Sequence, residues 1–266
     1  GIFAINELPD LHEKIQVGLF NLLEERDVQI RGYKVALPLD IIIIATANPE
    51  DYTSRGRIIT PLKDRFGAQI RTHYPRSLED EIRIVRQEST PFAADGFRLL
   101  LPRFMEEIVA EISRLARSRP DINHYSGISV RMSIHNRENL ISNAFRRSIR
   151  LREAEVVPRI SDLAHLTSSM KGKIEWDFAD ETGEPEKINL LIRDAVALVF
   201  KKVFPRESFA DFLKAFSAGD GIDVSEADAS SSYRSRISAY PQLAEKAALL
   251  AEGGSPALLA SAAEFI

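Results

Sequence analysis

The chain has 266 residues, a formal net charge of −4, 44% hydrophobic and 28% charged residues, and no cysteine. This length predicts two domains with room for a smaller third part, and the composition argues against a disordered chain. We expect no membrane insertion and no secretion signal, because no apolar run approaches the roughly 20 residues that span a bilayer. The lack of cysteine excludes disulfides and thiolate zinc sites, and it is typical of a cytoplasmic protein. The negative charge argues against a nucleic-acid partner.

The first part of the chain has the pattern of strands and helices in alternation. GIFAINE (residues 1–7) is an apolar run that predicts a buried strand, with Asn6 and Glu7 at its carboxyl end. Residues 9–26 predict a helix whose apolar face contains Leu11, Ile15, Leu19 and Leu22. Residues 28–35 alternate about Arg31-Gly32-Tyr33 and predict a β-hairpin.

A second buried strand is predicted by the four consecutive isoleucines at 41–44, which are typical of a parallel strand covered on both faces. Asn48-Pro49 ends it. LKDRFG (62–67) then predicts a short helical turn, and residues 69–72 predict a last strand. We expect these strands in one parallel sheet, whose carboxyl edge is where open α/β sheets place their chemistry.

The pattern becomes helical from Ser77 onwards. Helices are predicted at 78–88, at 103–118, from about Ser129, and at 186–204. Residues 217–236 are rich in Ser, Asp, Ala and Gly and predict a loose connection to an alanine- and leucine-rich helical tail. We therefore expect an α/β protein with an incomplete parallel-sheet core over 1–75, a helical lid over 76–204 and a helical extension over 205–266.

The order of these pieces resembles the second half of an AAA+ ATPase module, closest to the magnesium-chelatase and MoxR-like group with its additional hairpin. GIFAINE resembles the Walker B strand and ATANPED (45–51) the sensor 1 strand. LKDRFG resembles the arginine-finger turn, and SGISVRMSIHNRENL (126–140) the sensor 2 helix of the lid. Each motif alone is weakly specific, but four occur in order, and the resemblance covers about residues 1–151.

The resemblance implies an ATPase that uses ATP and Mg²⁺ and assembles as a homo-oligomeric ring to remodel a partner protein. In this interpretation Glu7 polarises the attacking water and Asn48 orients it. Arg65 reaches the nucleotide of a neighbouring protomer, and Arg131 reaches it from the lid of the same protomer. Such arginines stabilise the charge of the transferring phosphoryl group.

Two features depart from the family pattern. Asn6 stands where Walker B has an aspartate, so a neutral amide faces the magnesium and the bound nucleotide; it still suffices to hold a metal-bound water. The printed sequence also contains no G-x-x-x-x-G-K-[ST] loop, whose amides and lysine cradle the phosphates. Because the strand before that loop is central in an AAA+ sheet, we expect a gap or another segment between 41–46 and 69–72. We expect the chain to be a fragment of the module.

Simpler roles stay open for each residue. Asn6 and Glu7 fit a strand-end pair that caps the next helix, and Asn48-Pro49 fits an ordinary turn. Arg65 fits an exposed helix-end charge, with Arg55 or Arg57 as the alternative finger. Arg131 lies in an arginine-rich segment and also fits a solvated helical face. The alternative function is a nucleotide-responsive assembly subunit that hydrolyses ATP poorly. A nucleic-acid motor would use Arg31 and Lys34 on the hairpin, with little support from an acidic chain.

Overall fold

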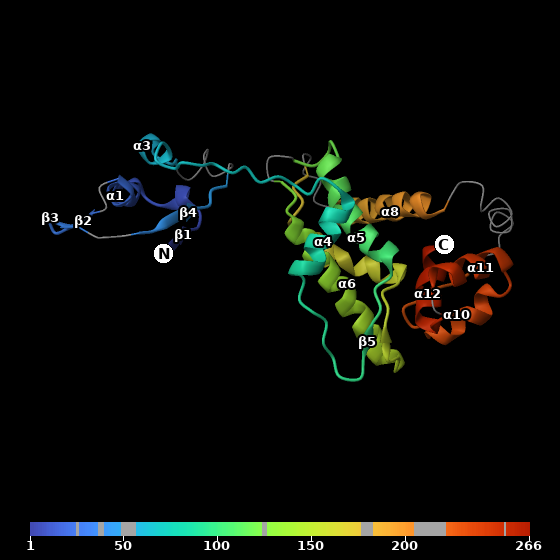
Figure 1. The fold of residues 1–266 in the computed structure, drawn as a ribbon. Coiled ribbons are helices and arrows are strands. Elements are labelled where there is room, and N and C mark those ends of the chain that lie inside the picture. Colours follow the sequence, from blue (N-terminus) through green and yellow to red (C-terminus); the bar gives the residue numbers. More distant parts are fainter. Residues whose placement is uncertain are drawn as a thin grey trace. The chain divides into compact units, whose positions relative to one another are not determined.

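The computed structural model divides the chain into two compact units, residues 1–73 and 74–266, which we describe separately (Figure 1). It describes residues 1–24, 27–36, 40–48, 57–123, 127–176, 183–204, 222–252 and 254–266. Both helices and strands are present, as an α/β chain requires. None of the helices in these ranges is long and apolar enough to cross a membrane.

The first unit contains the predicted parallel pair of strands. β1 (Ile2–Ile5) lies beside β4 (Ile42–Ala45) in parallel register, from Ile2 opposite Ile42 to Ile5 opposite Ala45. The prediction that both are buried is wrong for the described part of the unit, where Ile2 is 74% and Ile42 64% exposed. Two short strands alone present both faces to solvent, whereas isoleucine runs of this kind stabilise a sheet only when helices cover it.

The predicted first helix is two separate elements. A 3₁₀ turn, η1 (Leu8–Asp10), is followed by extended backbone at Leu11, and α1 (Glu13–Glu24) begins after it. The predicted apolar face is also wrong at Ile15, which is 53% exposed, while its neighbour Gln16 is buried. Because the backbone is extended at Leu11, α1 does not continue the helical phase of η1. The apolar positions counted from Pro9 therefore no longer fall on one buried side.

The predicted hairpin is confirmed. β2 (Asp27–Ile30) pairs antiparallel with β3 (Tyr33–Ala36), and Arg31 and Gly32 between them both have positive φ, as a two-residue hairpin turn requires. Lys34 forms an ion pair of 2.8 Å with Asp27. That pairing neutralises one of the two cations proposed for nucleic-acid binding.

The predicted strand at 69–72 is not formed. The chain leaves the short helix α3 (Thr60–Lys63) and continues without regular secondary structure, and Ile70 is 90% exposed. A strand exists only through hydrogen bonds to a neighbour, and no described strand lies beside these residues to provide them.

The second unit is mostly helical and follows the predicted boundaries closely. The expected helices appear as α4 (Leu78–Glu88), α5 (Arg103–Ser118), α6 (Val130–Leu151) and α8 (Glu184–Val203). Ser77 and Ser129 cap α4 and α6 by accepting backbone N–H groups with their side chains. β5 (Arg98–Leu99), which precedes α5, pairs parallel with β6 (Glu155–Val156), which follows α6. The short elements η2 (Ile160–Leu166) and α7 (Thr167–Met170) then lead to α8.

Three further helices lie at the C-terminal end of this unit: α10 (Ser230–Ile237), α11 (Pro241–Leu250) and α12 (Pro256–Phe265) (Figure 1). They form a small apolar cluster of their own. Phe265 also joins the main core, where its ring stacks on Phe104 of α5 with 4.4 Å between centroids. The tail is therefore packed onto the helical core by an aromatic contact as well as by polar groups.

Candidate functional site

The carboxyl ends of β1 and β4 bring two of the sequence motifs together. The backbone N–H of Glu7 donates to Oγ1 of Thr46 at 3.0 Å, and the N–H of Leu8 donates to the Thr46 carbonyl at 2.9 Å. The N–H of Thr46 donates in turn to the Ile5 carbonyl at 2.9 Å. Thr46, which the sequence argument did not single out, thus fixes the start of the Glu7 turn against the segment that leads to Asn48.

Glu7 has an unusual backbone conformation for this position. Its φ is 53° and its ψ 53°, in the left-handed region that a residue with a Cβ rarely adopts. Its side chain makes no capping hydrogen bond to η1. Strain of this kind is a feature of functional sites as well as of turns, and the simpler capping role predicted for Glu7 is not observed.

The other two polar residues at this edge, Asn6 and Asn48, are exposed, as Glu7 is. The edge therefore presents one carboxylate, two amides and the Thr46 hydroxyl to solvent. Oxygen atoms of these types suit Mg²⁺ with its retained waters and can orient a water molecule. Among the described residues, no group of three or more His, Asp or Glu side chains is arranged to hold a metal ion by itself.

Arg65 follows α3 and is engaged within its own unit. Its Nε donates to Oε2 of Glu24 at 2.9 Å, its second nitrogen bonds to the same carboxylate, and a third contact of 2.6 Å reaches the Pro61 carbonyl. The sequence did not indicate this pairing, because Glu24 and Arg65 are 41 positions apart. Of the alternative fingers, Arg55 lies outside the described residues.

Gln16 positions the segment that leads to Arg65. Its buried side chain donates to the carbonyls of Leu11 at 2.8 Å and Arg57 at 3.1 Å, and its Oε1 accepts from the N–H of Ile59 at 3.0 Å. A buried amide must satisfy its hydrogen bonds, and here it does so by holding the chain before α3 against α1. In the sequence, this role of Gln16 was indicated only by its place next to Ile15, one of the apolar positions of the predicted helix.

Arg131 lies in the second unit, at the exposed N-terminal turn of α6. The loop before it is fixed by Arg117 of α5, whose Nε donates to the Ile128 carbonyl at 2.9 Å. Arg117 also forms a two-point pair with buried Glu81, at 2.5 and 2.9 Å, and Ser133 donates to the same carboxylate at 2.6 Å. A rigid polar network thus sets the direction in which α6 begins.

No protein-family model, curated protein or solved structure matches the chain. The interpretation of this edge therefore depends on the order of the motifs and on the geometry described above.

Proposed function

We propose that this chain is the Walker B-to-lid part of an AAA+ remodelling ATPase of the magnesium-chelatase or MoxR-like group. The observation that carries the proposal is the hydrogen-bonded junction of Glu7 with Thr46 at the carboxyl ends of two parallel strands. It brings the candidate water-polarising carboxylate and the candidate sensor segment to one edge, although they are about 40 residues apart in sequence.

The proposed chemistry needs little from the protein beyond placement. ATP would supply the phosphoryl group, and Mg²⁺ would neutralise part of its charge. Glu7 would take a proton from the water that attacks the phosphoryl group. Asn48 would orient that water, while Asn6 would hold a metal-bound water. Arg65 of a neighbouring subunit and Arg131 of the lid would face the charge that develops on the phosphoryl oxygens.

The phosphate cradle has to come from polypeptide outside the printed sequence. Ile42 and Ile44 of β4 are exposed, as is Ile2 of β1, so the described sheet leaves apolar surface that a further strand and its helix would cover. A phosphate loop between such a strand and helix would place its amides at the same carboxyl edge as Glu7. A further strand and helix that carry the phosphate-binding loop would thus explain both the exposed isoleucines and the absence of this loop from the printed sequence.

The test is phosphate release measured for residues 1–266 alone and for the complete protein that the gene encodes. The proposal expects no ATP hydrolysis by residues 1–266 and hydrolysis by the complete protein, which Glu7→Gln abolishes while ATP still binds. Thr46→Val is the matched variant: it removes the hydroxyl contact and should lower turnover without abolishing it. Tight ATP binding by residues 1–266 alone would place the nucleotide elsewhere and overturn the proposal.

A second candidate is an assembly subunit of the same family that hydrolyses ATP poorly. Two observations favour it: Asn6 replaces the usual carboxylate, and Arg65 is bonded to Glu24 of its own chain. The two candidates differ in one measurement. Asn6→Asp should raise turnover severalfold if the amide limits hydrolysis, and should change it little if the subunit is already an efficient ATPase.

A further inference from the structure

Tyr74, the first residue of the helical unit, covers the guanidinium group of Arg117 from α5. The guanidinium carbon lies over the tyrosine ring, 4.5 Å from the ring centre. Each of the three nitrogens of this group already donates a hydrogen bond, to the Glu81 carboxylate or to the Ile128 carbonyl. The ring thus adds a cation–π contact on the face of a cation whose edge is already occupied. The proposed ATPase chemistry assigns no role to this contact.

The hydroxyl group of Tyr74 reaches the loop that precedes α6. A Cβ atom at position 127, which is glycine, would lie 2.6 Å from the hydroxyl oxygen, closer than unbonded carbon and oxygen atoms pack. Gly127 also has a φ of +63°, a conformation that glycine adopts without strain. Glycine at this position therefore permits both the turn of the loop and the close approach of the tyrosine.

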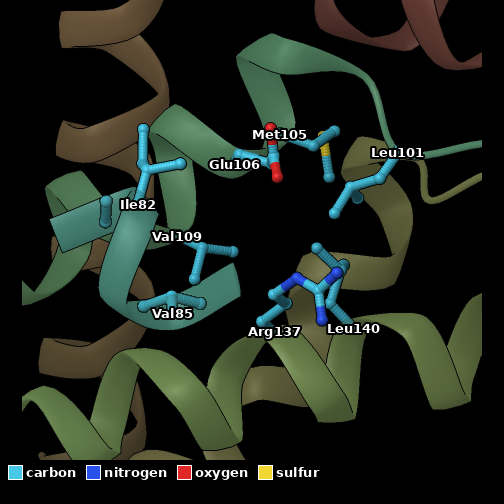
Figure 2. Close-up of a pocket in the computed structure, with 9 residues that line it drawn as sticks. Ile82, Val85, Leu101, Met105, Glu106, Val109, Arg137 and Leu140 are labelled. Carbon is cyan, nitrogen blue, oxygen red and sulfur yellow. The ribbon is translucent and has the colours of Figure 1, made fainter. Parts of the chain in front are cut away.

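The three helices that meet at Arg117 are closely packed. Glu81 of α4 accepts hydrogen bonds from Arg117 of α5 and from Ser133 of α6. Apolar side chains of the same helices surround a space of only about 10 Å³, which holds no more than about one water molecule (Figure 2). These side chains are Ile82, Val85, Met105, Val109 and Leu140. Packing of this density transmits a displacement of one helix to its neighbours.

Tyr74 lies where the chain enters this helical unit. Pro75 follows it and restricts its backbone to an extended conformation, which stiffens the entry. We propose that Tyr74 is a positioning residue, which joins the entering chain to the start of α6 through Arg117 and Gly127. These three residues and Glu81 form a clamp, so that a change in the direction of the entering chain is carried to α6.

The effect of the clamp on catalysis rests on the proposed function. Arg131 lies in the first turn of α6, and as part of an ATPase it would reach the nucleotide from the lid. Through the clamp, the direction of the chain that enters the lid would set how far Arg131 reaches. Tyr74 would touch no nucleotide itself and would act through Arg131.

Tyr74 can be replaced without removing a core residue, because it is 46% exposed. The experiment measures hydrogen exchange by mass spectrometry in the complete protein that the gene encodes. Tyr74→Leu should speed exchange of the amides of residues 131–134 by about fivefold or more, because the start of α6 loses the contact that holds Arg117. Tyr74→Phe keeps the ring and should exchange like the parent protein.

Lys187→Met is the matched control. It removes a cation that lies 5.4 Å from the centre of the Trp176 ring, a contact of the same kind that includes no residue of the clamp. Exchange at 131–134 should not change in this variant. Gly127→Ala should speed it, and adding Tyr74→Phe should restore part of the protection, because the oxygen that meets the new methyl group is then absent. A general loss of structure would not be reversed by a second substitution.

ATP turnover by the same variants tests the link to Arg131. Tyr74→Leu should lower kcat/KM by about fivefold and should have no further effect in the Arg131→Met background, because it acts through that arginine. Unchanged exchange at 131–134 in Tyr74→Leu, or equally fast exchange in Lys187→Met, overturns the clamp. An undiminished effect of Tyr74→Leu on turnover in Arg131→Met overturns the link to Arg131. Lack of ATP hydrolysis by the parent protein would overturn the proposed function instead, and hydrogen exchange alone would then decide on the clamp.

Discussion

Arg65 and Glu24 are joined by two hydrogen bonds to one carboxylate oxygen, which ties the turn after α3 to the last residue of α1. The proposed finger is therefore engaged within its own chain. A guanidinium group bonded in this way cannot at the same time reach a nucleotide in a neighbouring subunit. If Arg65 acts as a finger, its guanidinium group has to leave Glu24 when the ring assembles and bond to the phosphoryl oxygens of the neighbouring nucleotide instead. This change of partner has measurable consequences.

If the proposed function is right, Arg65→Ala in the complete protein should reduce ATP turnover by on the order of 10³-fold or more and leave nucleotide binding largely intact, because a trans-acting arginine stabilises charge that develops only in the transition state. Phosphate release and equilibrium binding of ATP check the two halves of this expectation. Mixed rings of Arg65→Ala and Glu7→Gln subunits should regain partial activity, since some interfaces then join an intact Glu7 to an intact Arg65. Full activity of Arg65→Ala would transfer the role to Arg55 or Arg57.

Glu24→Gln tests the exchange from the other side. Removing the charge frees Arg65 at little cost, because the pair is partly exposed and such pairs contribute less than about 1 kcal/mol to the free energy of unfolding. Under the proposed function, ATP turnover by the complete protein should therefore stay the same or increase. A decrease comparable to that of Arg65→Ala would show that Glu24 positions Arg65 for catalysis rather than holding it back.

The helical unit was predictable from the sequence because its elements are long and locally determined. The bounds of α4 and α5 match the prediction, since Ser77 caps the first and Pro102 precedes the second. The strands β1 and β4 were predictable from their apolar runs. Residues 69–72 were not, because a strand needs a partner that the local sequence cannot reveal, and the described structure offers none.

The candidate site was predictable only in part. The positions of Glu7 and Asn48 after two parallel strands follow from the apolar runs that precede them, and the structure joins these segments through Thr46. The bonds of Gln16 and Glu24 were not foreseeable, because each connects segments about 40 residues apart by hydrogen bonds that leave no periodic pattern.

A buried ion pair between Arg147 and Asp162 should be among the most sensitive points of the helical unit. Both side chains are almost fully buried and 2.9 Å apart, and Asp162 also accepts from Asn143 and from the N–H of Arg159. Asp162→Ala leaves the buried Arg147 with only the Val157 carbonyl at 2.6 Å and the Glu153 carboxylate at 3.9 Å, which should lower the free energy of unfolding by about 3 kcal/mol. Urea unfolding followed by circular dichroism measures this loss.

The matched control for that prediction is Asp194→Ala. Asp194 is also bonded to an arginine, Arg119 at 3.3 Å, but its side chain is 61% exposed. The expected loss is below about 1 kcal/mol. Equal losses in the two variants would show that burial of the Arg147 pair adds nothing to its contribution.

The acid stability of the C-terminal helices should depend on Asp228. Two hydrogen bonds of 2.7 Å from Arg236 lower the pKa of this carboxyl from its usual 3.8, and the N–H of Ser225 adds to the effect. A carboxyl with a lowered pKa in the folded state contributes stability that is present above pH 3.8 and is lost as the pH falls through the folded pKa. Asp228→Asn should therefore lower the free energy of unfolding by less than about 1 kcal/mol at pH 7 and flatten its dependence on pH below about pH 4.

Arg236→Met should give the same flattening, because it removes the other half of the pair, and the double variant should show no further change. Urea unfolding between pH 3 and pH 7 checks this, and an unchanged pH dependence in both single variants would contradict it.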